Sequence, residues 1–349
     1  MTHPSTDHLR GKKVLVTGGC GFIGMNLTAE LLRSGATVSV LDMPDADWDR
    51  LPQEVVQIRA DLLDPSTLTG VLEGVDIVYH LAARTDLDGT SLPDYRVNFE
   101  GTANLLAQVS GSTMPQRFVF YSTMLTVGVP DDTRFRDERT PYAADTLYGQ
   151  SKVEGERVVI DTCRRLGLPY TIIRPTSVYG PWGGAPYDAF FRTIKARRYF
   201  HVGKADNLVS WVYVKNLVDL TLTASVAQRA ENEIYFGSDL HPYTMREIVD
   251  TVAGHYGVRI RTLPTLALIA AAYGFGLLRL LGLSVPIYPA RLRNMRANYC
   301  FSMQKAVELG HVQRHDLAGG IAETLDWYDA RDRAVSGSVA RATGGEAAA

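Results

Sequence analysis

Cysteine is scarce in this 349-residue sequence. Its three cysteines, Cys20, Cys163 and Cys300, lie far apart, with no CxxC pair and no neighbouring histidines that would complete a metal site. Disulfide-held secreted domains and structural zinc modules carry more cysteines at closer spacing. The sequence therefore excludes a disulfide scaffold, predicts no metal site, and favours a reducing compartment, from which we expect a cytoplasmic protein.

Charge of one sign is also lacking. Lysine and arginine together number 36 against 38 aspartates and glutamates, which gives a net charge of −2. This balance provides no general electrostatic attraction to nucleic acid, so we expect no nucleic-acid partner. The amino-terminal MTHPSTDHLRGKK has no apolar segment that could serve as a signal peptide, so secretion is not expected either.

The sequence has no apolar run long enough to predict a stable membrane span. Between Arg261 and Arg279 lie 17 uncharged residues, TLPTLALIAAAYGFGLL, interrupted by proline and glycine. A membrane-spanning helix usually needs about 20 predominantly apolar residues. The run favours a buried or pocket-lining helix, and an interfacial patch or access for a greasy substrate is the alternative. The small, polar residues 331–349 are expected to form a flexible tail.

What the sequence does contain is a repeated alternation of short apolar strands and amphipathic helices. Strands are expected at 12–17, 36–42, 54–59, 76–83, 117–123 and 170–175, and helices at 22–35, 65–73, 94–110 and 148–166. Such alternation predicts an α/β fold of the Rossmann type, a doubly wound parallel sheet with helices on both faces. We expect residues 1–175, with roughly 208–235, to form this main domain. Residues 176–207 and 236–330 would form a smaller α/β domain over the carboxyl ends of the strands, where open sheets of this kind bind ligands.

A glycine-rich turn follows the first expected strand. The sequence TGGCGFIG places Gly18, Gly21 and Gly24 between a strand and a helix. That context allows a tight turn, close approach of the backbone to a diphosphate, and a helix amino terminus facing the phosphates. Asp42 ends the second strand, where a carboxylate can accept hydrogen bonds from ribose hydroxyls and repel a 2′-phosphate. The sequence therefore predicts a dinucleotide site that prefers NAD to NADP.

The stretch DTLYGQSK at 145–152 places a phenol and an ammonium one helical turn apart. Tyr148 and Lys152 are four residues apart, so they would share one face of a helix. A nearby positive charge stabilises a phenolate and lowers the pKa of the phenol. The pair is a candidate acid/base site, although the same spacing also occurs on ordinary amphipathic helices.

In these motifs and their order the sequence resembles the extended short-chain dehydrogenase/reductases. This is the NAD-dependent epimerase/dehydratase group, which includes nucleotide-sugar epimerases and hydroxysteroid dehydrogenases. The resemblance spans nearly the whole chain. The matching motifs are TGGCGFIG, LDM, ADLLD at 60–64, YHLAA at 79–83, VNFEGT at 97–102, YST at 121–123, YGQSK at 148–152, RPTSVYGP at 174–181 and VYVKNLVD at 212–219.

The resemblance implies roles for individual residues. Thr123 would hydrogen-bond the substrate oxygen, Tyr148 would transfer the proton, and Lys152 would bind the nicotinamide ribose and lower the pKa of the phenol. Ser122 is an alternative hydroxyl, but strand alternation turns it to the other face. The cofactor site implied is Gly18, Gly21, Phe22, Ile23, Gly24, Asp42, Asp61, Leu62, Leu81, Ala82, Ala83, Asn98, Tyr148, Lys152 and Pro175, and the substrate site is Arg84, Thr123, Ser177, Arg293 and Arg296.

The substrate class stays open between two alternatives. Nucleotide-sugar epimerases usually have an asparagine at the position of Ser177 and an arginine at that of Val209, which weakens this assignment. Arg293 and Arg296 could instead clamp a diphosphate. The apolar run at 262–278 and Val209 favour a lipophilic alcohol, as in hydroxysteroid dehydrogenases. Candidate aromatic pocket residues are Trp182, Tyr187, Phe190, Phe191 and Trp211.

Three further expectations follow from the resemblance. Simple 4,6-dehydration is disfavoured, because Met124 and Leu125 stand where dehydratases often carry an acid/base pair. A non-catalytic NAD-binding module is a remote alternative, because such proteins usually have lost a member of the Thr123, Tyr148 and Lys152 set. The helices at 94–110 and 148–166 match those that commonly form the four-helix interface of a homodimer.

Overall fold

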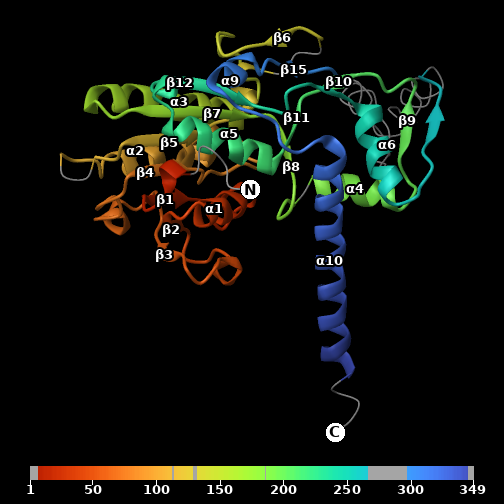
Figure 1. Ribbon diagram of the computed structural model, residues 1–349, viewed down its shortest axis with the longest axis horizontal. Helices are drawn as coiled ribbons and strands as arrows, with labels where there is room; N and C mark the ends of the chain where they lie inside the picture. Colours follow the sequence, from red (N-terminus) through yellow and green to blue (C-terminus); the bar gives the residue numbers. More distant parts are fainter. Residues whose placement is uncertain (1–6, 112–113, 129–131, 185, 266–296, 345–349) are drawn as a thin grey trace.

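The computed structural model describes residues 7–111, 114–128, 132–184, 186–265 and 297–344. Its main feature is a seven-stranded parallel sheet in the order β12-β7-β5-β4-β1-β2-β3 (Figure 1). The predicted Rossmann-type fold is confirmed. The strands are β1 (Lys13–Thr17), β2 (Thr37–Asp42), β3 (Val56–Arg59), β4 (Ile77–His80), β5 (Arg117–Tyr121), β7 (Tyr170–Pro175) and β12 (Glu233–Gly237).

The order of the strands fixes where a ligand can enter. The chain winds outwards from β1 through β2 to β3, then returns to β4 on the other side of β1. A crevice therefore opens at the carboxyl ends of β1 and β4, the switch point at which sheets of this type bind nucleotides. The central strands are apolar and buried on both faces, as parallel strands under two helical layers must be.

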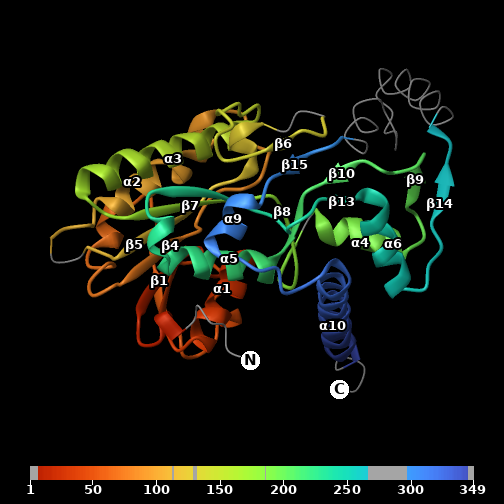
Figure 2. The same ribbon diagram turned by 45° about the horizontal axis from the view of Figure 1, so that its top comes forward.

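Helices cover both faces of the sheet. One face carries α1 (Phe22–Arg33) and α5 (Val214–Val226), and the other carries α2 (Glu100–Leu106) and α3 (Leu147–Leu166) (Figure 2). Helix α3 begins at a threonine cap, because Thr146 Oγ1 accepts a hydrogen bond from Gly149 N at 3.0 Å. It ends at Gly167, which adopts the left-handed conformation with φ of 70°. These two caps fix the register of the helix that carries Tyr148 and Lys152.

Two of the predicted helices differ in the structure. Residues 65–73 form only the short 3-10 helix η3 (Pro65–Leu68), where the side chain of Asp64 accepts a hydrogen bond from Ser66 N. The helix predicted at 94–110 is divided at Phe99 into η4 (Leu92–Asn98) and α2. The remaining 3-10 helices are η1 (Asp7–Leu9), η2 (Trp48–Arg50), η5 (Met124–Val127) and η6 (Gln228–Ala230).

A second group of elements packs beside the carboxyl edge of the sheet. Four two-stranded pairs occur in it: β8 with β11, β9 with β14, β10 with β13, and β6 with β15. Its strands are β6 (Phe135–Arg136), β8 (Ser177–Tyr179), β9 (Phe200–Val202), β10 (Leu208–Val209), β11 (Trp211–Tyr213), β13 (Tyr243–Thr244), β14 (Arg261–Leu263) and β15 (Cys300–Phe301). Its helices are α4 (Tyr187–Lys195), α6 (Met245–His255) and α10 (Leu317–Gly344), whereas α9 (Gln304–Leu309) packs against α5 and β12 of the main sheet.

Helix α10 continues through the region predicted to be a flexible tail. Its first half packs against α4 and α6, and the rest extends away from the body of the molecule as far as Gly344 (Figure 1). Ion pairs from Lys195 to Asp329 at 2.6 Å and from Arg331 to Asp188 at 3.0 Å hold it to α4. The small and polar composition of this segment suggested a tail, but it does not prevent a helix from propagating beyond an anchored turn.

None of the helices in the described residues is long and apolar enough to cross a lipid bilayer. Most of the apolar run at 262–278 lies outside the described residues.

Candidate active site

The glycine-rich turn connects β1 to α1 at the switch point. Gly18 has φ of 71° and donates its N–H to Leu41 O at 2.8 Å. A Cβ atom at Gly18 would lie 2.7 Å from Ala82 N, and one at Gly24 would lie 2.2 Å from Gly18 O. Only glycine fits at these two positions, because the atoms in the way belong to the backbone. Helix α1 has no side-chain cap at Gly21, so its first N–H groups can bind an anion.

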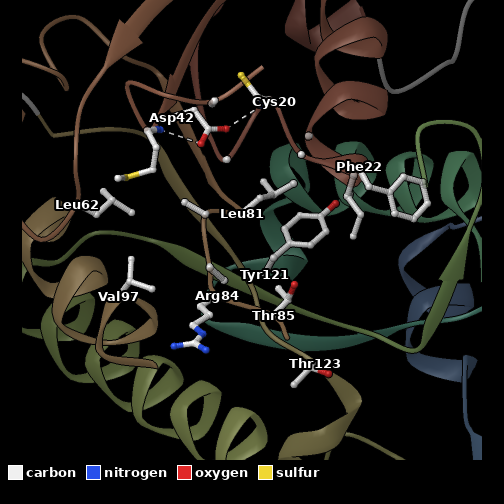
Figure 3. Close-up of a pocket in the computed structure, with 18 of the residues that line it drawn as sticks. Cys20, Phe22, Asp42, Leu62, Leu81, Arg84, Thr85, Val97, Tyr121 and Thr123 are labelled. Atoms are coloured by element: carbon white, nitrogen blue, oxygen red, sulfur yellow. Dashed lines mark hydrogen bonds between the residues drawn. The ribbon is translucent and has the colours of Figure 1, made fainter. Parts of the chain in front are cut away.

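Asp42 lies at the end of β2, beside the glycine-rich turn. Its Oδ2 accepts a hydrogen bond from Cys20 N and its Oδ1 accepts one from Met43 N, each at 2.9 Å (Figure 3). Each carboxylate oxygen can accept a further hydrogen bond, so the group is held in place with capacity left for ribose hydroxyls. Burial and the neighbouring Asp42 raise the pKa of the Cys20 thiol to about 12, so this thiol stays protonated.

A cavity of about 950 Å³ runs from Asp42 to Thr123 along the carboxyl edge of the sheet (Figure 3). It brings together most of the predicted residues: Gly18, Gly21, Phe22, Ile23, Gly24, Asp42, Asp61, Leu62, Leu81, Ala82, Ala83, Arg84, Thr123, Tyr148, Lys152 and Pro175. Sequence reasoning missed other lining residues: Cys20, Leu41, Met43, Ala46, Asp47, Ala60, Leu63, Thr85, Val97, Tyr121, Thr176, Val178 and Gly184. Ser122, which strand alternation placed on the other face, also lines the cavity, and its hydroxyl donates to Glu156. Most of the missed residues lie inside the quoted motifs, such as Cys20 in TGGCGFIG and Val97 in VNFEGT, so the motifs were recognised but these positions within them were given no role.

Thr123 and Tyr148 lie at the end of the cavity remote from Asp42. Thr123 follows β5, is 8% exposed, and caps η5 by accepting a hydrogen bond from Leu125 N at 3.3 Å. A side-chain hydrogen bond joins Thr123 to the Tyr148 phenol and favours ionisation, but burial dominates and raises the pKa of Tyr148 to about 12. The sequence predicted that Lys152 would lower this pKa. In the structure burial raises it, and the group that acts in the opposite direction is Thr123, not Lys152.

Lys152 lies one helical turn beyond Tyr148 and is 2% exposed. Its Nζ is 4.3 Å from the centroid of the Phe120 ring. Burial lowers the pKa of Lys152 to about 7, and the carboxylate of Glu156 acts in the opposite direction. At neutral pH the ammonium is therefore close to its titration midpoint, and its charge depends on its neighbours.

Asn98 is buried behind the cavity and is not one of its lining residues. Its Nδ2 donates to Arg84 O at 3.0 Å and to Ser151 Oγ at 2.9 Å, and its Oδ1 accepts from Arg84 N at 2.8 Å. Ser151 in turn donates to Tyr148 O at 2.7 Å. Asn98 thus ties the loop after β4 to the turn of α3 that carries the phenol.

His80 is a buried residue of the site that sequence reasoning did not single out. Thr102 donates its hydroxyl hydrogen to Asn98 O, so its oxygen accepts from His80 Nε2 at 2.9 Å. His80 Nδ1 then accepts from Thr17 Oγ1 at 2.7 Å. Burial lowers the pKa of His80 to about 3, which keeps the ring neutral in this arrangement. The chain of bonds fixes the end of β4 against β1, and the histidine of YHLAA was its only sequence signal.

The predicted substrate residues are only partly brought together. Arg84 lines the cavity, but its guanidinium forms two hydrogen bonds with Asp86, at 2.8 and 3.1 Å. Ser177 does not line the cavity, because its hydroxyl lies 3.2 Å from that of Tyr299. Arg293 and Arg296 lie outside the described residues.

The predicted aromatic residues divide in the same way. Tyr187 lines the cavity, and its ring packs edge-on against Trp211 with centroids 5.2 Å apart. Trp182, Phe190, Phe191 and Trp211 contribute instead to the packing of the second group of elements.

A parallel sheet with a glycine turn, a carboxylate and a hydroxyl, phenol and ammonium at one edge defines a dinucleotide-binding oxidoreductase. A model of the NAD dependent epimerase/dehydratase family matches residues 14–236. Because this match covers more than half of the chain, the protein belongs to that family. It is an NAD-dependent enzyme.

Proteins similar to this chain carry names from both branches of the family. A 3-beta-hydroxysteroid dehydrogenase of Mycolicibacterium neoaurum is 28% identical over 340 residues, which cover 90% of this chain and 91% of the relative. A UDP-glucose 4-epimerase of Vibrio cholerae is 32% identical over 262 residues, 71% of this chain and 76% of the relative. The solved structure of the epimerase Mth375 from Methanothermobacter thermautotrophicus superposes with a TM-score of 0.77 at 21% identity, covering 96% of this chain and 99% of that one, and shows the shared fold.

Proposed function

We propose that the protein oxidises a secondary alcohol to a ketone, either as its net reaction or as the first step of an epimerisation. The observation that supports this is the shared cavity, which has the glycine turn and Asp42 at one end and Thr123, Tyr148 and Lys152 at the other. When bound there, NAD supplies the hydride acceptor. The protein must hold the carbinol oxygen and move its proton.

Each of the three side chains has a distinct role in this proposal. Thr123, fixed at the cap of η5, donates a hydrogen bond to the substrate oxygen. Tyr148 exchanges the proton with that oxygen. Lys152, facing the same cavity, binds the nicotinamide ribose and contributes positive charge. General acid/base catalysis by such a positioned group accelerates a reaction by roughly 10²–10⁴-fold.

The protonation states make the two directions of the reaction unequal. With a pKa of about 12, the Tyr148 phenol is neutral throughout the working pH range and is ready to donate a proton to a ketone. Oxidation needs the phenolate, which at pH 8 amounts to only about one molecule in 10⁴ for such a pKa. The kcat/KM for oxidation should therefore rise with pH, and that for reduction should not require ionisation of Tyr148.

The first candidate substrate is a nucleotide-sugar. Support comes from the similarity to the UDP-glucose 4-epimerase. An N-acetyl-alpha-D-glucosaminyl-diphospho-ditrans,octacis-undecaprenol 4-epimerase of Escherichia coli, 27% identical over 321 residues, is named for a sugar diphosphate carried on a lipid, so it supports a diphosphate-linked sugar and not the nucleotide itself. The predicted diphosphate clamp by Arg293 and Arg296 stays part of this proposal. In such an epimerase the ketone would be reduced again, with no net change of cofactor.

The second candidate is a lipophilic alcohol, as the dehydrogenase relative suggests. Here the supporting observation is a cluster of aromatic residues at the position where a sugar-binding asparagine would be expected. Ser177 bonds to Tyr299, Trp211 Nε1 donates to the same Tyr299 hydroxyl at 3.2 Å, and Tyr187 presents its ring to the cavity. The Ser177 hydroxyl is therefore engaged and is a poor ligand for sugar hydroxyls.

The experiment combines a Tyr148→Phe variant with a substrate panel of UDP-hexoses and 3β-hydroxysterols. Net oxidation is followed at the absorbance band of reduced nicotinamide, and epimerisation by chromatography. We expect turnover with one class, a loss of at least 10²-fold in Tyr148→Phe, and unchanged calorimetric affinity for NAD. The matched control is Tyr79→Phe, because this buried phenol donates to Ser225 at 2.8 Å, remote from the cavity. Full activity in Tyr148→Phe would overturn the proposal.

We also propose a cytoplasmic homodimer. The support for a dimer is the position of α2 and α3 together on one face of the sheet, as in the predicted four-helix interface (Figure 2). Light scattering after gel filtration tests it. A particle of the monomer mass of 38.4 kDa at micromolar concentration would contradict the dimer.

A further inference from the structure

A buried ion pair lies directly behind the catalytic trio. Glu156 of α3 is fully buried, and Arg174 of β7 is 2% exposed. Arg174 Nε donates to Glu156 Oε1 at 2.9 Å, and Arg174 Nη2 donates to Glu156 Oε2 at 2.7 Å. This two-point geometry is the one in which a guanidinium best compensates a carboxylate removed from water.

Two further donors complete the shell around this carboxylate. Ser122 Oγ donates to Glu156 Oε1 at 2.5 Å, and Tyr142 OH donates to Glu156 Oε2 at 2.7 Å. Ser122 adjoins Thr123 at the end of β5, and Arg174 adjoins Pro175, which lines the cavity. The carboxylate of Glu156 therefore connects three segments that reach the cavity: α3, the end of β5 and the end of β7. Four hydrogen bonds, two from Arg174 and one each from Ser122 and Tyr142, fix the position of this buried carboxylate.

Glu156 is also the acidic residue one helical turn beyond Lys152 on α3, and it is the carboxylate that acts on the pKa of Lys152. The two residues are four apart, and side chains at this spacing lie on the same face of a helix. Among the described residues, the other ionisable groups around Lys152 carry no negative charge that could take the place of Glu156. Tyr148 of α3 is a neutral phenol, and His80 of β4 is a neutral imidazole.

The remaining ionisable groups come from the elements packed against α3. Tyr95 of η4, whose ring centroid is 6.3 Å from that of Tyr148, donates its hydroxyl to Asp86 O. Tyr142 precedes α3 and donates to Glu156, and burial together with the charge of that carboxylate raises its pKa, so it is neutral as well. Arg174 of β7 is positive and would repel the ammonium if Glu156 were absent.

We propose that Glu156 is a positioning residue whose charge, fixed by Arg174, Ser122 and Tyr142, increases the fraction of Lys152 that is protonated near neutral pH. Lys152 is buried against Phe120 and would otherwise lose its proton because desolvation disfavours the charged form. The relevance to catalysis rests on the function proposed above, but the electrostatic effect itself does not require turnover.

The direct test is the titration of Lys152 without cofactor or substrate. Protein labelled with ¹³C at the lysine side chains is titrated by NMR, and the Lys152 signal is assigned by its loss in Lys152→Arg. Replacing the carboxylate in Glu156→Gln should lower the pKa of Lys152 by roughly one to two units, as expected for charges about 6 Å apart at an effective dielectric constant near 20. The matched control is Glu154→Gln, because this exposed residue of α3 pairs with Arg157 at 2.7 Å. It should leave the pKa of Lys152 unchanged.

A second variant keeps the test decisive if Glu156→Gln does not fold. Glu156→Met combined with Arg174→Met replaces the buried pair by apolar side chains, a change that proteins often tolerate. Because this change also removes the positive charge of Arg174, it should lower the pKa of Lys152 by less than Glu156→Gln does. An unchanged pKa of Lys152 in the folded Glu156 variants, or an equal shift in Glu154→Gln, would overturn the inference.

A failure of the proposed role of Glu156 can be told apart from a failure of the proposed reaction. If the pKa of Lys152 falls as expected while Tyr148→Phe retains full turnover, the electrostatic role of Glu156 stands and the reaction proposal is wrong. If Tyr148→Phe is inactive and Lys152 does not respond to Glu156, the reverse holds.

Discussion

Two glycine-to-alanine substitutions with opposite expected outcomes test the architecture of the cofactor turn. At Gly24, a Cβ atom would lie 2.2 Å from Gly18 O and 2.7 Å from Gly19 Cα. Both are backbone atoms, so no side-chain rotation can relieve the overlap. At Gly254, in the last turn of α6, a Cβ atom meets nothing within 4 Å. The same chemical change is therefore forbidden at one site and free at the other.

The magnitudes follow from these distances. A carbon and an oxygen pack at more than 3 Å, so Gly24→Ala must displace the turn by about 1 Å, at a cost of roughly 1–3 kcal/mol in the free energy of unfolding. Gly254→Ala should raise the free energy of unfolding by up to about 1 kcal/mol, because alanine loses less backbone entropy in a helix. The shifted turn should also weaken NAD binding by at least tenfold, or 1.4 kcal/mol.

Urea denaturation measures the two stabilities, and calorimetric titration with NAD measures the affinities. Gly254→Ala lies outside the cavity, so its affinity for NAD should match that of the wild type. If Gly24→Ala binds NAD as tightly as the wild type and is equally stable, the close approach of α1 to the Gly18 turn is wrong. That result would also remove the basis for placing a diphosphate there.

Three further predictions concern charged residues. Asp42→Ala should weaken NAD binding by about tenfold or more and reduce the preference for NAD over NADP, because it removes a carboxylate that accepts hydrogen bonds from the ribose and repels a 2′-phosphate. Calorimetric titration with each cofactor measures both effects. The folded-state pKa of Lys152 is about 7, below its ordinary 10.5, so the unfolded chain binds more protons between these values and its contribution to stability rises with pH there. We therefore expect the free energy of unfolding, measured without NAD between pH 7.5 and 8.5, to rise more steeply with pH in the wild type than in Lys152→Met, by about 1 kcal/mol per pH unit. Equal slopes in the two proteins would contradict the lowered pKa of Lys152. Arg117 is 4% exposed and donates hydrogen bonds to Thr171, Ala224 O, Ala227 O and Glu231. Arg117→Met should therefore lower the free energy of unfolding, measured by urea denaturation, by about 3–5 kcal/mol. An unchanged denaturation midpoint would refute a stabilising role of this buried charge.

The parts of the site that sequence reasoning predicted are those set by local chain geometry. A strand, a glycine turn and a helix determine the position of Gly18, Gly21 and Gly24 within eight residues. A four-residue spacing on α3 determines that of Tyr148 and Lys152. Such relations follow from helical and strand periodicity, so they can be derived before any tertiary contact is known.

Contacts between distant segments were not accessible in the same way. Ser177 was expected in the substrate site because of its place after RPT, but its hydroxyl is held by Tyr299, 122 residues later in the chain. Glu156 and Arg174 were not singled out, although a glutamate one turn after Lys152 was a visible signal. Side-chain pairing across a sheet and a helix depends on packing that neither segment encodes alone.

Burial explains the one electrostatic expectation that was wrong. Helical spacing predicted an ammonium near the Tyr148 phenol, and from this a lowered pKa. Yet the same enclosure that brings the two groups together removes water from both, which raises the pKa of the phenol to about 12 and lowers that of the ammonium to about 7. Desolvation thus acts against the charged form of each partner, and a lysine that is only half protonated near pH 7 is a weak source of positive charge. Glu156, held by the bidentate guanidinium of Arg174, acts against this loss of charge on Lys152, and it is not one of the residues that line the cavity, where a carboxylate would repel an anionic ligand. On α3, the proposed pair of Tyr148 and Lys152 is therefore followed one helical turn later by Glu156, a positioning residue that acts on Lys152 and touches no substrate.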